Sequence, residues 1–397
     1  MKLSTKIITN NPALEIAGRE LQRIAQRSST RNLLIFIPLV VFLFLGFIYL
    51  KGALREVPVA VYDADKTPLS RTLIRYIDAS LYAKIDRYIT SEDDVQDIFL
   101  SYPDIHALYF IPHGLEKSIL LGESAKIKVF TNSTNIVYGN LMYKDASTIT
   151  MTISVGILLK KIMAAGFPPE KAMSLAMPIK VHTHPLFNPY YNYLYYLLPG
   201  LMTVLLQMLL FFAVTRSINS EVNEGTIHSL YHIAQYKIRN IIIGKVLAYF
   251  TMGLSLVSLI FVLYGIFGIP IKGNLLSLLF LFSYFIIATI LLAMMLSSIV
   301  QDEILAMDIA FFYNSPAFVF SGFTFPMFAM PFFDSLYGRL IPYTHFLYAF
   351  FKLYQMGTSF SYIITEIVHI TVFLFIGLTG TAIALKLRIK NQSSASL

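Results

Sequence analysis

The sequence contains no cysteine and no tryptophan, and only 14% of its 397 residues are charged. The lack of cysteine excludes disulfides, thiolate zinc sites and cysteine nucleophiles. A soluble chain of this length needs more charge to cover its surface. Hydrophobic residues make up 56% of the chain, which points to a membrane protein. Its interfacial belts must then be formed by tyrosine and phenylalanine.

Motifs for catalysis are also missing. The chain has no Gly-x-x-x-x-Gly-Lys-Ser/Thr loop for nucleotide phosphates and no Ser/His/Asp or paired-carboxylate set. His182 and His184 could share one face of a strand, but no acidic third ligand is near, so we predict no metal site. The net charge of +8 comes without a basic run interleaved with aromatics, so we predict no nucleic-acid partner.

Six apolar runs are long enough to cross a bilayer. We therefore predict an α-helical membrane protein with six transmembrane helices, the first at residues 33–50. The other five fall within residues 191–390, at 193–214, 241–264, 275–299, 304–325 and 362–385, and 391–397 form a tail. Lysines and arginines before the first span, between the second and third, and after the last predict cytoplasmic termini.

Residues 1–32 are expected to hold a cytoplasmic amphipathic helix. Arg19, Arg23 and Arg27 fall on one side, and the apolar stripe opposite them consists of Leu14, Ala17, Leu21, Ile24, Ala25 and Ser28. We expect this helix to lie on the membrane surface with its basic face toward anionic lipid head groups. The alternative is a tail helix packed on protein.

Residues 51–190 have frequent charges and no long apolar run, and they predict an extracytoplasmic α/β domain. The expected helices include one capped by Thr67 with Pro68 at its first position. Strands are expected at 57–62, 105–111 and 126–130, helices at 67–80, 91–100, 113–121 and about 132–165, and a loop from Gly166.

The loop at 216–240 holds the segment that bears most on function. As a helix, it places Glu221, Glu224 and His228 opposite an apolar stripe that includes Leu230. This arrangement predicts an acidic edge beside a membrane span, which a partner protein could grip. The alternative is an ordinary solvated helix.

This loop resembles that of the permeases of type-two ABC exporters, in which an acidic residue, Glu-Gly-Thr, a leucine and Gly-Lys precede the next span. The matching residues are Glu221, Glu224, Gly225, Thr226, Leu230, Gly244 and Lys245, whereas His228 stands where the family often has glutamate. Further matches are Pro199-Gly200, Ser321-Gly322 with Pro326 and Pro331, and Pro342 with Gly357 in a re-entrant extracytoplasmic segment at 326–358. Val59–Asp63 and Ser70-Arg71 resemble the branch with a large extracytoplasmic domain.

The resemblance implies a membrane permease subunit, not itself an enzyme, in a bacterial inner-membrane exporter. It implies docking of a cognate ABC ATPase through Glu221, Glu224, Gly225, Thr226, His228 and Leu230. ATP and magnesium would bind that ATPase, and this chain would bind no cofactor. The implied cargo is a hydrophobic or amphiphilic drug or lipid. Implied partners are a second permease copy or paralogue, membrane lipids and other envelope proteins.

Four residues within the apolar runs are candidates for a translocation path: Pro199, Gln207, Asp308 and Asn314. A charged aspartate at the bilayer centre costs about 2.5–3.5 kcal/mol on insertion scales, so it normally faces protein or a cavity. The alternative for Asp308 is a place near the cytoplasmic interface, because it follows Glu303 closely. A different function, that of an envelope receptor or assembly factor acting through residues 51–190, leaves the Glu221–Thr226 motif without a role.

Overall fold

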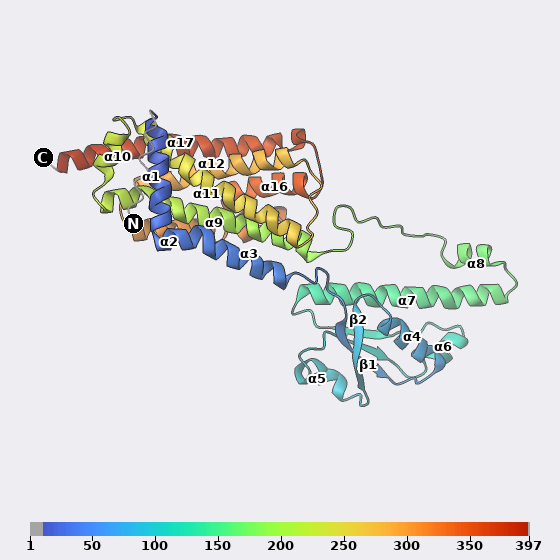
Figure 1. Ribbon diagram of the computed structural model, residues 1–397. Helices are drawn as coiled ribbons and strands as arrows, with labels where there is room; N and C mark the ends of the chain where they lie inside the picture. Colours follow the sequence, from blue (N-terminus) through green and yellow to red (C-terminus); the bar gives the residue numbers. More distant parts are fainter. Residues whose placement is uncertain (1–10, 396–397) are drawn as a thin grey trace. The chain divides into compact units, whose positions relative to one another are not determined.

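The computed structural model describes residues 11–395 and divides the chain into two compact units (Figure 1). The helical unit consists of Met1–Gly52 and Pro185–Leu397, of which 11–52 and 185–395 are described. The α/β unit is Ala53–His184. The prediction of a mostly helical membrane protein with an inserted α/β domain is confirmed.

The α/β unit is built on a four-stranded mixed sheet in the order β2-β1-β3-β4. The central strands β1 and β3 pair in parallel, and their apolar residues are buried on both faces. β4 pairs antiparallel with β3. The strands are β1 Val57–Asp63, β2 Ala83–Ile89, β3 Ala107–Ile111 and β4 Lys128–Thr131.

Helices cover both faces of this sheet. Val59, Leu73 and Met142 share one buried cluster, so α4 and α7 lie on the same face. Ala60, Ile98 and Leu108 form the cluster on the other face, beneath α5. The helices are α4 Pro68–Asp78, α5 Asp94–Ser101, α6 Leu115–Leu120, α7 Ile136–Ala164 and α8 Pro169–Ala176. The sequence did not predict β2, which exposes most of its side chains at the sheet edge, or α8.

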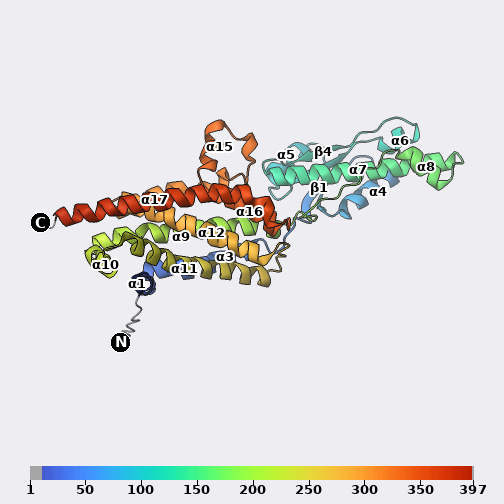
Figure 2. The same cartoon turned by 90° about the horizontal axis from the view of Figure 1, so that it is seen from above.

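The helical unit contains long helices joined by short turns (Figures 1 and 2). Near its start are α1 Pro12–Gln26, α2 Ser28–Arg31, a π-helical turn Asn32–Phe36 and α3 Ile37–Ile48. The remainder is α9 Tyr193–Asn223, α10 Ile227–Ile233, α11 Ile238–Ile266, α12 Leu275–Ile299, α13 Glu303–Asn314, α14 Ala317–Phe320, α15 Phe332–Arg339, α16 Pro342–Tyr354 and α17 Ile364–Ala395, with short 3-10 turns before α15 and α17.

Within the described residues, six helices are long and apolar enough to cross a membrane; five correspond to expected spans, and Ile136–Ala164 stands in place of the expected 304–325. They are Ser28–Ile48, Ile136–Ala164, Tyr193–Asn223, Ile238–Ile266, Leu275–Ile299 and Phe360–Asn391. The second of these is α7, whose residues Met142, Ala146 and Ile149 pack into the core of the α/β unit. A helix fixed to a sheet in this way belongs to the α/β unit.

The expected continuous span at 304–325 is wrong, because α13 ends at Asn314 and Pro316 follows at once. The broken segment nevertheless runs the length of α9. Glu303 pairs with Arg216 near the end of α9, and Asn314 bonds Gln207 midway. Phe323 packs against Gly200 near the start of α9. The segment 303–323 is therefore a broken helix packed along α9, and the backbone groups freed at the break are tolerated in an apolar environment only where protein surrounds them.

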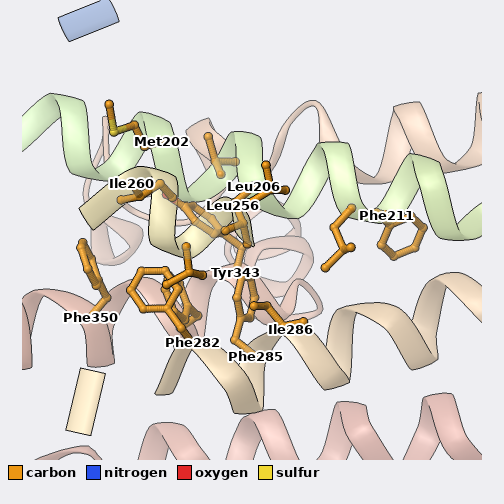
Figure 3. Packing of buried hydrophobic residues seen from close by; sticks show 14 of the residues in the cluster. Met202, Leu206, Phe211, Leu256, Ile260, Phe282, Phe285, Ile286, Tyr343 and Phe350 are labelled. Carbon is orange, nitrogen blue, oxygen red and sulfur yellow. The ribbon is translucent and has the colours of Figure 1, made fainter. Parts of the chain in front are cut away.

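The segment 326–358, predicted to be re-entrant, contains a helix that packs into the core of the helical unit. α16 buries Tyr343 and Phe350 near Phe282 and Phe285 of α12 (Figure 3), and Phe346 belongs to the same cluster. The rings of Phe285 and Phe346 are stacked with their centroids 4.1 Å apart. Aromatic packing of this kind fixes α16 within the bundle.

We predict that residues 53–184 fold without the helical unit. Leu73→Ala, at a side chain 4% exposed, should lower the free energy of unfolding by about 2–5 kcal/mol. Leu100→Ala, 81% exposed, should change it by about 0.5 kcal/mol or less. Thermal unfolding followed by circular dichroism measures both. An insoluble fragment without a cooperative transition would place α7 in the membrane instead.

Candidate coupling site

The end of α9 is shaped by a glycine turn. Gly225 has φ +67°, a left-handed conformation that glycine adopts without strain. The amide of Gly225 donates to the carbonyl of Val222, and the amide of Thr226 donates to the carbonyl of Glu221 at 2.8 Å. This pair of bonds is a Schellman motif, which ends a helix and turns the chain sharply into α10. The motif explains why the sequence needs glycine here.

Glu221 lies one turn before this glycine, and its carboxylate is fully buried. Arg19 of α1 donates to both carboxylate oxygens, at 2.9 and 3.0 Å. Arg23 also pairs with this carboxylate, and the Thr226 hydroxyl donates to it. Lys245 of α11 lies 3.5 Å away. One carboxylate thus joins α1, α9, α11 and the turn before α10, and we call these contacts the Glu221 clamp.

A second buried carboxylate, Glu20 of α1, extends the clamp. It accepts hydrogen bonds from Lys245 Nζ at 2.7 Å and from Tyr249 Oη at 2.9 Å. Lys245 also donates to the carbonyl of Ser217 at 2.9 Å. Buried charges are tolerated when they are paired and hydrogen-bonded in this way.

Gly244 lets α1 come close enough for these bonds. A Cβ at this position would lie 2.6 Å from Ile16 Cβ and 2.7 Å from the carbonyl oxygen of Ala13. Any larger side chain would therefore push α1 away from α11. The Gly244-Lys245 pair has a physical explanation: glycine allows the approach, and lysine neutralises the carboxylate it meets.

The expectation that the arginines of α1 face lipid head groups is wrong. Arg19 and Arg23 bind Glu221, and Arg23 and Arg27 bind Glu224. The buried stripe of α1 is Ala13, Ile16, Ala17, Glu20 and Ile24, on the side that carries the arginines. Carboxylates on α9 attract the basic face, so α1 packs on protein.

The expected acidic edge is only partly exposed. Glu221 is buried in the clamp, whereas the Glu224 side chain is 48% exposed beside Arg23 and Arg27. Gly225 and His228 are exposed, and Thr226 is half-buried. Leu230 is buried with Ile16, Ile218 and Leu385. The surface open to a partner is therefore Glu224, Gly225 and His228, which we call the docking turn.

The structure brings together two of the four residues predicted for a translocation path. Gln207 and Asn314 are fully buried and joined by a 2.7 Å hydrogen bond. Pro199 is buried inside α9, where it cannot donate to the carbonyl of Tyr195, and the Tyr354 hydroxyl donates there instead. Asp308 is separate, exposed on the outer side of α13.

A further ion pair ties α13 to the same end of α9. Arg216 Nε donates to Glu303 at 2.6 Å, and Asn223 donates to the other oxygen of that carboxylate at 3.1 Å. These residues border a hollow of about 780 Å³ together with Gln301 and Asp302. These bonds tie α13 to the end of α9 that precedes the docking turn.

Sequence reasoning missed Arg19, Glu20, Arg23 and Arg27 as parts of this site. One signal was available, since Ile16 and Glu20 stand on the arginine face of α1, where a lipid-bound helix would carry only basic and polar groups. The partner carboxylate lies 202 residues away from Arg19, and no local pattern predicts that pairing.

Comparison with known proteins agrees with this layout. The sequence model of a family described as "ABC-2 family transporter protein" matches residues 29–385. The chain is 25% identical over 208 residues to the "Probable multidrug ABC transporter permease YbhS" of Escherichia coli K12 and of Escherichia coli O157:H7. The match covers 51% of this chain and 54% of each relative, so the chain spans about half the length of the curated relatives it matches.

We predict that Glu221→Gln lowers the free energy of unfolding of the full chain by about 3–5 kcal/mol, because it removes from Arg19, Arg23 and Lys245 a fully buried carboxylate that all three share. Glu224→Gln is the matched control and should cost about 1 kcal/mol or less, since its side chain is 48% exposed. Unfolding midpoints in detergent measure the difference. Equal midpoints for the two variants would show that the clamp contributes nothing to stability.

The clamp also predicts a pH dependence. Burial acts to raise the pKa of Glu20, but the charge and hydrogen bond of Lys245, with Arg23 and Tyr249, outweigh it, so this pKa lies below its ordinary value. The resulting stability is fully present above the ordinary glutamate pKa of about 4.3. It is lost as pH falls through the lowered pKa.

The midpoint difference between the wild type and Glu20→Gln should therefore be constant near neutral pH and shrink below about pH 4. Unfolding scans of both proteins across this range measure it. A difference that grows on acidification would contradict the sign of the shift.

Proposed function

The chain belongs to the ABC-2 family of transporter proteins, and we propose that it is the membrane permease subunit of an ATP-driven exporter. It is a multi-pass membrane protein by family and by its apolar helices. We place it in a bacterial inner membrane with both termini in the cytoplasm. Two permease chains and a separate ABC ATPase would form the working machine, with ATP and magnesium on the ATPase.

The observation that carries this proposal is the Glu221 clamp beside an exposed turn. A partner that binds the docking turn pushes on the end of α9. Because Glu221 ties α9 to α1 and α11 through buried ion pairs, those helices move with it. The coupling residues are then Glu224, Gly225 and His228 for contact, and Glu221, Thr226 and Leu230 for transmission into the bundle.

Cargo would pass along the helices that move when a partner binds the docking turn. α9 and the kinked α13 share the Gln207–Asn314 bond at mid-length, and Pro199 lies nearer the start of α9. The helix that breaks after α13, and α9 with its internal Pro199, can pack against each other in two alternative arrangements. We propose a hydrophobic or amphiphilic cargo, in keeping with the multidrug name of the relatives, and Asp308 as a contact to a second permease chain.

The test is purification of the tagged full chain from its own membranes. We predict that an ABC ATPase is recovered with it and that His228→Asp lowers the recovery about tenfold, the loss expected for about 1.4 kcal/mol of binding free energy. His182→Asp in the α/β unit is the matched control and should leave recovery unchanged. Recovery of no ATPase, or equal recovery with both variants, would refute docking at this turn.

A further inference from the structure

A cavity of about 700 Å³ lies in the part of the helical unit remote from Glu221. One of its walls is Gly322, and the next residue, Phe323, packs on Gly200 near the start of α9. Glu221 is 21 residues further along α9, which is about 30 Å of helix. Figure 2 shows α15, which contributes Arg339, standing out from the bundle at this place.

The polar groups of this cavity are basic or neutral. Arg339, His345 and His369 line it, and no carboxylate does so among the described residues. Within residues 11–395, the Arg339 guanidinium makes no salt bridge or hydrogen bond. The Glu366 carboxylate forms its salt bridge with Lys352, at 2.6 Å, and not with Arg339. An exposed, unpaired arginine in a concave site is a binding group for an anion.

The two histidines are held in a fixed arrangement beside this arginine. Their rings stack with centroids 4.5 Å apart and an interplanar angle of 12°. His345 Nε2 donates to the carbonyl of Arg339 at 3.0 Å, and His369 Nδ1 donates to the carbonyl of Thr365 at 2.8 Å. Each ring therefore has one nitrogen engaged by a backbone carbonyl, and the second nitrogen, Nδ1 of His345 or Nε2 of His369, is left over from these bonds.

Tyr348 adds a hydroxyl to the same wall. A Cβ on Gly322, where φ is +84°, would lie 2.7 Å from this hydroxyl, so glycine makes room for it. The remaining wall is apolar and includes Met327 and Phe328, and the Phe328 side chain is 93% exposed. The cavity thus has one polar wall, with the Arg339 cation, and an apolar rim, and its volume lies in the range of small-molecule sites.

We propose that this cavity binds the acidic head group of an amphiphile, with a phosphate or carboxylate on Arg339 and an apolar tail against Met327 and Phe328. The ligand could come from the bilayer, as an anionic lipid, or from the cargo, as an amphiphilic acid. Binding needs no ATPase, so this proposal stands or falls separately from the exporter function.

The lack of tryptophan in the chain provides the test. Phe328→Trp places the only tryptophan of the chain at the rim, in the full chain purified in neutral detergent. Dibrominated phosphatidylglycerol, dibrominated phosphatidylcholine and dibromostearate then act as quenchers. We expect the two acidic probes to reach half-quenching at an about tenfold lower mole fraction than phosphatidylcholine, a factor typical of charge-assisted hydrogen bonds.

Arg339→Gln in the Phe328→Trp background should abolish this preference, and Arg339→Lys should keep most of it. Arg239→Gln, at the start of α11, is the matched control and should change nothing. Preference for phosphatidylglycerol alone assigns the site to bilayer lipid, and preference for both acids assigns it to acidic amphiphiles in general. Equal quenching by all three probes, or a preference that survives Arg339→Gln unchanged, would overturn the proposal.

Discussion

The buried carboxylate of Glu221 is the constraint on which the arrangement of this end of the protein depends. A buried carboxylate is stable only when cations and donors surround it, and here they come from α1, α11 and the turn before α10. All of these elements must therefore be in place together. Two glycines allow this arrangement. Gly225 turns the chain back toward Glu221, and Gly244 leaves room for α1.

α9 connects the Glu221 clamp to the rest of the bundle through contacts along its length. α9 carries Glu221 at one end, the Gln207 bond to Asn314 at its middle and the Gly200 contact with Phe323 near its start. Pro199 lies inside the continuous α9, whereas the helix beside it breaks at Pro316. Tyr354 satisfies the carbonyl that Pro199 leaves free, as an apolar environment requires. The buried ion pairs at one end of α9, and its contacts with the broken helix further along, suit a helix that moves as one body.

Much of the fold followed from local patterns, and the failures have specific causes. β1, β3, α4 and the long apolar helices have strong periodicity and good caps, such as Thr67 with Pro68. β2 was missed because an edge strand with Lys84, Asp86 and Arg87 lacks an apolar signal. The span at 304–325 was drawn as continuous because hydropathy does not register the break at Pro316.

The candidate site was predicted only in part, for a physical reason. The motif from Glu221 to Leu230 marked the correct segment, but its main contacts come from residues about 200 positions earlier. Periodicity in α1 indicated the stripe with Leu14 and Ala25, whereas the buried stripe includes Ile16 and Glu20. Electrostatic pairing with α9 outweighed the apolar moment of the isolated helix, and sequence periodicity does not report such a partner.

The central claim is that α1 is held on α9 and α11 by the Glu221 clamp, and labelling of single cysteines tests it most directly. The chain has no cysteine of its own. Ile16 is buried against Gly244, and Ala25 is exposed. In native membranes opened to a water-soluble maleimide, Ala25→Cys should react readily and Ile16→Cys should be protected. The reverse pattern, with Ile16→Cys reactive and Ala25→Cys protected, would place α1 on lipid and contradict the clamp.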